Sequence, residues 1–458
     1  MALPRGLVSR EMVAQLPGIK STKVSLTPAN SSGDFKYSSQ GQSRILFSIP
    51  AYENSFISTK RSYIAFQIKA TGAQAAEAVL GDGCPVFRRM MVRNGRGQVI
   101  EDVSEYDLLC KIHDNMKTKT EIAGSASTTK DMRVIKSDHI SDSIDYSTPK
   151  TVIHQLRSGL LGKAQTFLVP VSSMSASGGK AFTLELWLND PGSVFPMSRH
   201  ATLTDINYEL TEVTMELDLV EVSQELMTNI NTELNNGGTI PLPYTSYRSH
   251  PAQIASGSSA VINISDSSHN VNAVYSVFRP QTAGTTITAI GDDDAGKLNN
   301  RFGTACNPFA FLGGKKKITG TNVTNSTTVV SKYVYRYASK YYPTAPVSLV
   351  GDSILALENM KSGFELDGAM KTPYFAETIV VGDKMVPRFE CDTFILGVNF
   401  KTTSDPILSG LNTSSTGSPL MLEVSFEQSV TAIECMTFVE SASVLYIGRG
   451  GQSSTIHN

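Results

Sequence analysis

The sequence has 458 residues, of which 40% are hydrophobic and only 18% are charged, and its 40 Lys and Arg residues nearly balance 42 Asp and Glu residues. This composition supports a large buried core and excludes a disordered chain, a collagen-like rod and a charge-rich coiled coil. Because the net charge is only −2, we do not expect the protein to coat nucleic acid or to bind it sequence-specifically.

Residues 1–43 form a predicted N-terminal arm that is rich in Ser, Thr, Gly and Pro. The arm and the residue after it carry six basic residues against two acidic ones. The basic residues are Arg5, Arg10, Lys20, Lys23, Lys36 and Arg44, and the acidic ones are Glu11 and Asp34. The segment is either a flexible solvated terminus or an arm that reaches a neighbouring subunit or an acidic interior. In the second case Arg5, Arg10, Lys20 and Lys23 are the candidate assembly residues.

From residue 44 onward the hydrophobic pattern has a period of two, which predicts β-strands. The predicted strands of the first half are 44–50, 62–70, 86–103, 182–190 and 206–222. Asn94-Gly95 interrupts the third of these and predicts a hairpin with a two-residue turn. A helix is predicted at 104–116, with Ser104 as its N-cap and Asp107 as the capping-box partner.

A second predicted helix, 224–234, ends at the linker 235–238 (Asn-Asn-Gly-Gly) near the midpoint of the chain. The predicted strands after it are 259–265, 272–280, 329–342, 393–402, 419–427 and 436–448, with a short helix at 353–360. We therefore divide the chain into an arm (1–43), a first β-domain with its bridging helix (44–235) and a second β-domain with a C-terminal tail (236–458). So many short strands indicate an all-β protein built of sandwiches or jelly rolls.

The two halves also end alike, which indicates a weak internal duplication. Ser158-Gly159-Leu160 and Ser409-Gly410-Leu411 each precede a strand that is followed by a second alternating strand. The alternative is a chance similarity between common strand and turn residues.

The sequence predicts no catalytic, cofactor-binding or metal-binding site, and we expect the protein not to be an enzyme. Its seven His residues lack the spacing of a zinc site. Glu101, Asp102 and Glu105 could supply a carboxylate pair for glycoside hydrolysis, but capping and the helix dipole explain acids at the start of the predicted helix. The acidic loop 291–297 fits neither a P-loop nor an EF-hand, and Lys315 to Lys317 fit an exposed hairpin tip.

The five cysteines indicate a reducing compartment. Cys84, Cys110, Cys306, Cys391 and Cys435 are odd in number, widely spaced and without a C-x-x-C pair, so we expect buried thiols. Residues 1–18 lack the apolar core of a signal peptide, and no apolar run approaches the ~18 residues of a membrane span. We therefore expect neither secretion nor a transmembrane helix.

The order of these blocks resembles the double jelly-roll major capsid proteins of the adenovirus and tectivirus lineage, and most nearly those of polinton-like viruses and virophages. The blocks that carry the resemblance are RILFSIP (44–50), VFRRMMVRNGRGQVIEDVSEYDLLCKI (86–112), YELTEVTMELDLVEV (208–222), KYYPTAPVS (340–348) and FILGVNFKT (394–402). The long insertions that build the towers of adenovirus hexon are not apparent, which indicates a compact subunit with modest loops.

This resemblance implies two upright jelly-roll barrels per chain and homotrimeric, pseudo-hexagonal capsomers that tile an icosahedral shell in the virion of a dsDNA virus. The implied partners are other copies of the chain, a penton or vertex protein and minor capsid proteins, with an internal membrane as a further option. It implies no cofactor and no catalytic residue. The alternatives are a carbohydrate-binding or carbohydrate-active β-sandwich protein, disfavoured by a single Trp, and a fibre-like spike or tail protein.

Overall fold

The structure is a computed structural model that describes most of both predicted β-domains. The described residues are 20–31, 36–73, 75, 78–80, 84–115, 146–162, 165–174, 179–195, 197–198, 206–281, 288–289, 311, 317–319, 322–324, 330–348, 376–381, 384–389, 394–401, 409–414, 419–448 and 453–457. Among them, no helix combines the length and the hydrophobicity needed to cross a membrane.

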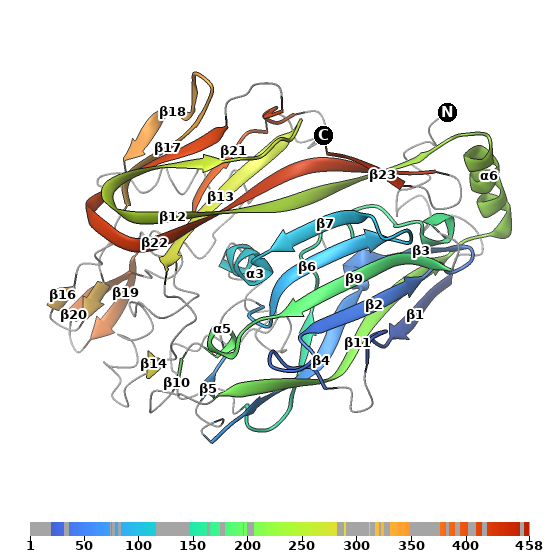
Figure 1. Ribbon diagram of the computed structural model, residues 1–458, viewed down its shortest axis with the longest axis horizontal. Coiled ribbons are helices and arrows are strands. Elements are labelled where there is room, and N and C mark those ends of the chain that lie inside the picture. The colour runs from blue at the N-terminus through green and yellow to red at the C-terminus, as the bar shows by residue number, and fades with distance from the viewer. Residues whose placement is uncertain are drawn as a thin grey trace.

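Two antiparallel sheets form a barrel in the first half of the chain (Figure 1). The first sheet has the order β1 (Lys20–Leu26), β11 (Asn207–Glu221), β4 (Tyr63–Thr71) and β8 (Lys150–His154), and β3 (Ser55–Ile57) also pairs with β11. The second sheet has the order β2 (Arg44–Pro50), β9 (Lys180–Leu188), β6 (Phe87–Asn94) and β7 (Val99–Ser104). When these eight main strands are numbered along the chain, the sheets read 1-8-3-6 and 2-7-4-5, a double-sheet arrangement in which long connections repeatedly cross between layers.

A larger sheet contains the strands of the second half. Its path is β18 (Lys340–Ser348), β17 (Val330–Tyr337), β22 (Leu420–Ile447), β13 (Val271–Pro280) and β21 (Leu396–Asn399), while β12 (Ile240–Ile264) and β23 (Ser453–His457) also pair with β22. In Figure 1, β12 and β22 run along the upper side of the molecule, from the larger sheet of the second half on the left to a position above the first barrel.

The remaining elements are short. Three small sheets are formed by β5 (Ala78–Val79), β10 (Met197–Ser198) and β14 (Thr288–Ala289), by β15 (Lys317–Thr319) and β16 (Asn322–Thr324), and by β19 (Ala376–Val381) and β20 (Lys384–Phe389). Among the described residues, the helices are α3 (Tyr106–Asn115), α5 (Pro191–Val194) and α6 (Gln224–Asn235), with 3-10 turns at η1 (Thr59–Arg61) and η4 (Val171–Met174). Because β14 belongs to the second half and pairs with β10 of the first, the halves share a sheet.

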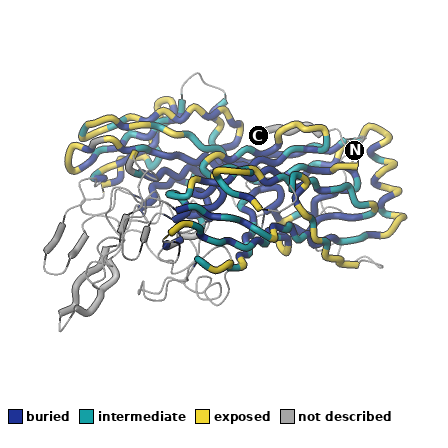
Figure 2. Tube along the Cα trace, turned by 60° about the horizontal axis from the view of Figure 1, so that its bottom comes forward, coloured by how far each residue is buried: buried dark blue, intermediate teal, exposed yellow. Residues whose placement is uncertain are grey.

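The hydrophobic core is also shared between the halves. One cluster of buried side chains includes the inward faces of both sheets of the first barrel together with Tyr244, Tyr275 and Phe438 from β12, β13 and β22. A second cluster, which includes Ile262 and Tyr335, fills the second half. Figure 2 shows buried residues in both halves of the molecule. The all-β prediction is confirmed by the strands and sheets described above.

The predicted boundaries of the first helix and of the β6–β7 turn were wrong, because the register in which β6 and β7 pair is not indicated by the local sequence pattern. The helix predicted at 104–116 begins at Tyr106, because Ser104 ends β7 and Glu105 adopts a positive φ of 52°. The β6–β7 turn is longer than the predicted two residues: Asn94 and Gln98 close it by a 2.9 Å backbone hydrogen bond, and the left-handed residue is Gly97 (φ 86°), not the glycine after Asn94. This is the three-residue hairpin type, with glycine at the bulge.

In the second half, long-range pairing lengthens or divides the predicted strands. The strand expected at 259–265 is the end of β12, and 419–427 and 436–448 are two ends of the continuous β22, because β12 and β22 pair along nearly their whole length. The run 329–342 is not one strand but β17, a turn at Ala338 and the start of β18. The helix predicted at 353–360 lies outside the described residues.

The helix α6 follows its sequence signals closely. The Ser223 hydroxyl accepts a hydrogen bond from the Leu226 N–H at 3.4 Å, which caps the N-terminus. Gly237 has a φ of +87°, as expected for a helix that ends at an Asn-Asn-Gly-Gly linker. The chain then enters β12, so α6 leads from the last strand of the first barrel into the second half.

Candidate functional site

The predicted assembly residues are only partly described. Lys20 and Lys23 are exposed on β1, where Lys23 pairs in register with Asp218 of β11. Arg5 and Arg10 lie outside the described residues. Residues 20–26 of the predicted arm are therefore a strand of the first sheet, and the role of the four basic residues in assembly stays a prediction.

Glu101 is buried between the first barrel and β12. Its carboxylate accepts hydrogen bonds from the Ser158 hydroxyl and from the Gly159 N–H at 2.8 Å, and the residue is only 4% exposed. Burial raises the pKa of Glu101 to about 7, although the hydrogen bonds it accepts oppose that shift. Gly159 in turn packs so tightly on β12 that an added Cβ would lie 1.5 Å from the Thr245 carbonyl oxygen.

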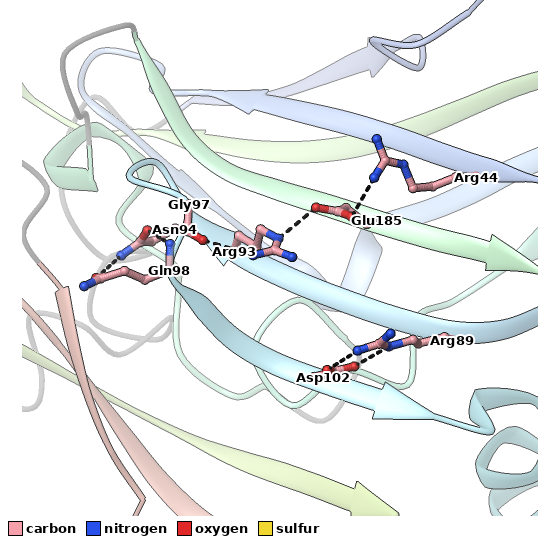
Figure 3. Close-up of polar contacts among 8 residues, drawn as sticks. All are labelled: Arg44, Arg89, Arg93, Asn94, Gly97, Gln98, Asp102 and Glu185. Carbon is pink, nitrogen blue, oxygen red and sulfur yellow. Dashed lines mark hydrogen bonds and ion pairs between the residues drawn. The ribbon is translucent and has the colours of Figure 1, made fainter.

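Asp102 lies on the opposite, outward face of the second sheet, where it binds Arg89. The Arg89 guanidinium donates to both carboxylate oxygens at 2.7 and 2.5 Å (Figure 3). The same guanidinium lies 5.2 Å from the centre of the ring of Trp187, its cross-strand neighbour on β9. Asp102 therefore holds Arg89 against the tryptophan ring.

The same face carries a second ion-pair cluster around Glu185 of β9 (Figure 3). Arg93 of β6 donates to Glu185 at 2.8 Å, and Arg44 of β2 lies 3.5 Å from its other oxygen. Glu185 is nearly buried beneath these side chains, since its side chain is 9% exposed. This face of the second sheet therefore carries paired Arg and acidic residues, with Arg89 over the single tryptophan, Trp187. These partners were not predicted from the sequence.

Glu105 joins the first barrel to the second half by ion pairs. Its carboxylate lies 3.2 Å from Arg279 of β13 and 3.5 Å from Arg88 of β6, and Arg279 also binds Glu434 of β22 at 2.6 Å. Arg279 is largely buried, with 15% of its side chain exposed. This guanidinium therefore bridges two carboxylates that come from different halves of the chain.

Asp107 is buried beside this cluster at the start of α3. It accepts a hydrogen bond of 3.0 Å from the Asn189 side chain and is 3% exposed. Burial, and then the charge of Glu105, raise the pKa of Asp107 to about 7. The predicted capping role was wrong, because the residue that would be capped, Ser104, belongs to β7.

The three acids considered for glycoside hydrolysis thus have separate structural partners. Glu101 is enclosed, Asp102 is bound to Arg89, and Glu105 is bound to two arginines. Asp102 and Glu101 lie in a strand rather than a first helical turn, so the dipole account of these two residues was wrong. None of the three offers an unengaged carboxylate for general acid or base chemistry.

The other candidates from the sequence are resolved in part. Cys84, Cys110 and Cys435 are buried thiols without a disulfide, as predicted, whereas Cys306 and Cys391 lie outside the described residues. The described part of the chain holds no group of three or more His, Cys, Asp or Glu residues that could bind a metal ion. The loop 291–297 is not described, and of the three lysines only Lys317 is, at the start of β15.

The repeated Ser-Gly-Leu triplets have similar surroundings. An added Cβ on Gly410 would lie 1.7 Å from Asn270 Oδ1, much as one on Gly159 would meet Thr245. Leu411 pairs with Val271 through two backbone hydrogen bonds of 2.9 Å. Each triplet is therefore a point of close approach to a strand of the second half, while the internal duplication itself stays a prediction.

Comparison with solved structures identifies the architecture. A chain of the PBCV-1 virus capsid matches with a TM-score of 0.56 at 10% identity, covering 96% of this chain and 97% of that one. The Faustovirus major capsid protein matches with a TM-score of 0.55 at 10% identity, covering 94% and 91%, respectively. A chain of the Sputnik virophage matches with a TM-score of 0.54 at 10% identity, covering 96% and 88%.

The chain has a double jelly-roll fold. The matches cover both halves and not one barrel alone, so the predicted fold class is confirmed. No family model and no curated protein matches the sequence. In this double jelly roll, the ion pairs of Arg279 and the contact of Gly159 with β12 fix one barrel against the other.

Proposed function

We propose that this protein is the major capsid protein of an icosahedral virus and is located in the virion. The observation that carries the proposal is the length of the match: 96% of this chain and 97% of a PBCV-1 capsid chain superpose as one unit, both barrels included. The proposal is an analogy from fold, supported by the fact that the match extends over both barrels.

We further propose that three copies assemble into a pseudo-hexagonal capsomer. Two similar barrels per chain give six per trimer, which approximates a hexagon under three-fold symmetry. This arrangement needs the two barrels of a chain to keep a fixed relative orientation. The shared core and the buried Arg279 bridge supply that rigidity.

The remaining surfaces of the capsomer would meet other proteins. Residues before β1, including Arg5 and Arg10, are proposed to contact neighbouring copies, minor capsid proteins or a membrane beneath the shell. A separate vertex protein would fill the five-fold positions. The outward face of the second sheet, with its Arg residues and Trp187, has a composition typical of protein interfaces, which are enriched in these two residue types.

The experiment is to purify the full-length chain and measure its mass by light scattering during size-exclusion chromatography. We expect three times the 49.4 kDa of one chain, and hexagonal particles by electron microscopy. When the chain is produced together with its vertex protein, we expect closed shells. A monomer at every concentration, with no lattice or shell, would contradict the proposal.

A glycan array and a broad glycosidase assay test the carbohydrate alternative on the same preparation. We expect no specific signal, because Glu101, Asp102 and Glu105 are engaged with their own partners. A clear hit, together with a monomeric mass, would favour the alternative function.

A further inference from the structure

The strand β18 carries two regularly spaced prolines at the outer edge of the larger sheet (Figure 1). Its residues 343–346 read Pro-Thr-Ala-Pro, so the two prolines stand three positions apart. Among the described residues, β18 pairs with β17 on one side, and no strand pairs with its other side. The outer side of this 343–346 segment is therefore not used by any strand in the described part of the chain.

The 343–346 segment leaves the ladder that β18 forms with β17. Before the segment, Tyr342 pairs with Tyr335 of β17. After it, Val347 pairs with Tyr333, so four residues of β18 stand opposite one residue of β17. An extended chain covers about 16 Å in five residue steps but only about 7 Å in the two steps available on β17. The segment therefore arches away from the ladder.

Both ends of the segment are fixed in the hydrophobic cluster of the second half. The Tyr342 ring packs against Phe400, with 5.0 Å between the ring centroids, and Val347 is only 1% exposed. Between these two residues, Pro343 is half-buried and residues 344–346 are exposed. The segment is thus held at both ends and presented to solvent. A ligand that is ordered before binding loses less conformational entropy when a partner binds it.

The backbone preferences of the segment favour the polyproline II conformation. Proline fixes its own φ at about −65°, and it restricts the residue before it to the extended or polyproline II region. These restrictions apply to Pro343, to Pro346 and to Ala345 before it. Sequences with the spacing Pro-x-x-Pro are bound in this conformation by domains that have a groove lined with aromatic side chains.

Protection of the sheet edge explains only part of these features. Edges are commonly protected by a proline whose nitrogen faces solvent or by a lysine. The exposed Lys340 already supplies a charge on β18. Edge protection gives no reason for a second proline at Pro-x-x-Pro spacing, or for four residues that leave the ladder together.

We propose that the 343–346 segment is a binding site for a protein domain that receives Pro343 and Pro346 in a groove of aromatic side chains. The partner carries an acidic residue beside this groove, opposite Lys340. Charge supports this choice, because β17 and β18 hold three basic residues and no acidic one. The inference goes beyond the proposed function and does not depend on it, because the segment belongs to a single chain.

The test measures binding of the full-length protein to purified SH3, WW and EVH1 domains, which bind proline-rich segments. A synthetic peptide of residues 340–348 first identifies the domain that binds it most tightly, and this domain is then titrated with the protein. Pro346→Ala is the test variant, made both in the protein and in the peptide. Thr344→Ala is the matched control, because Thr344 is also exposed and its replacement leaves both prolines in place.

We expect the wild type and Thr344→Ala to bind the domain equally well. Pro346→Ala should bind about tenfold more weakly, because one apolar side chain is lost from the groove. Its unfolding midpoint should not change, since Pro346 is exposed and unpaired, and the peptide should show the same loss without any effect of folding. Equal binding of the proline variant would overturn the inference. So would a peptide that no domain binds, or a protein that fails to bind although the peptide does.

Lys340→Glu tests the acidic residue expected in the partner, with Lys20→Glu on the distant strand β1 as its control. Lys340→Glu should weaken binding, and added salt should reduce the difference from the wild type because it screens the charges. An unaffected Lys340→Glu variant would refute the acidic residue in the partner. The mass of the protein tests the proposed function separately: a trimer that does not bind the domain refutes only this docking site, whereas a monomer that binds it refutes only the capsid proposal.

Discussion

Replacing Glu101 by Gln should change how the stability of the protein depends on pH. Burial raises the pKa of Glu101 from 4.5 to about 7, so the folded protein holds this proton more tightly than the unfolded chain does. The free energy of unfolding must then fall as the pH rises from about 4.5 to 7. One pKa unit corresponds to about 1.36 kcal/mol, which gives a total loss of about 3 kcal/mol from this group.

The glutamine variant keeps the local hydrogen bonds but cannot ionise. Its side-chain oxygen can accept from the Gly159 N–H, and its amide can donate to the Ser158 hydroxyl, as a protonated Glu101 would. We therefore expect equal stability of the two proteins near pH 4 and a variant that is more stable by about 3 kcal/mol at pH 8.

The assay is chemical unfolding of the purified protein at half-unit steps from pH 4 to pH 8, followed by fluorescence. The quantity of interest is the difference between the variant and the wild type at each pH. Asp102→Asn is the matched control, because Asp102 is the next residue along β7 but is partly exposed and bound to Arg89. A difference that does not change with pH, or a variant less stable at pH 8, would refute the reasoning.

Three further changes probe the contact between the barrels. Asp107→Asn should also raise the free energy of unfolding at pH 8 and leave it unchanged near pH 4, because burial raises the pKa of the Asp107 carboxyl. A difference between variant and wild type that does not depend on pH would contradict this. Gly159→Ala places a methyl group 1.5 Å from a backbone oxygen of β12 and should lower the free energy of unfolding by at least about 3 kcal/mol. The control Gly97→Ala lies in an open turn and should lower it by only about 1 kcal/mol in the same assay. Arg279→Ala removes the shared partner of Glu105 and Glu434, leaving Glu105 with only the exposed Arg88, and should cost about 3 kcal/mol. Arg88→Ala should cost less than about 1 kcal/mol, and equal losses would show that the bridge contributes little.

Several elements were fully determined by local sequence. The strand 44–50 coincides with β2 because its alternating apolar residues require one buried face, and all three of its odd-numbered apolar residues have no exposed surface. The helix α6 begins after Ser223 and ends before Gly237, because capping and glycine act within a few residues. Period, caps and strand order were sufficient to indicate an all-β fold of two barrels.

Tertiary structure decided what depends on partners distant in sequence. Nothing near Glu101 in the sequence shows that Ser158 and Gly159 enclose it. The capping role predicted for Asp107 was wrong because Ser104, the expected N-cap, belongs to β7. The long strands β12 and β22 exist because each satisfies the backbone of the other. The local pattern therefore predicted only residues 259–265 of β12 and two separate pieces of β22, 419–427 and 436–448. Local pattern thus determines which face of a strand is buried, whereas pairing and desolvation between residues far apart in sequence determine how long the strand is and which carboxylates keep their protons.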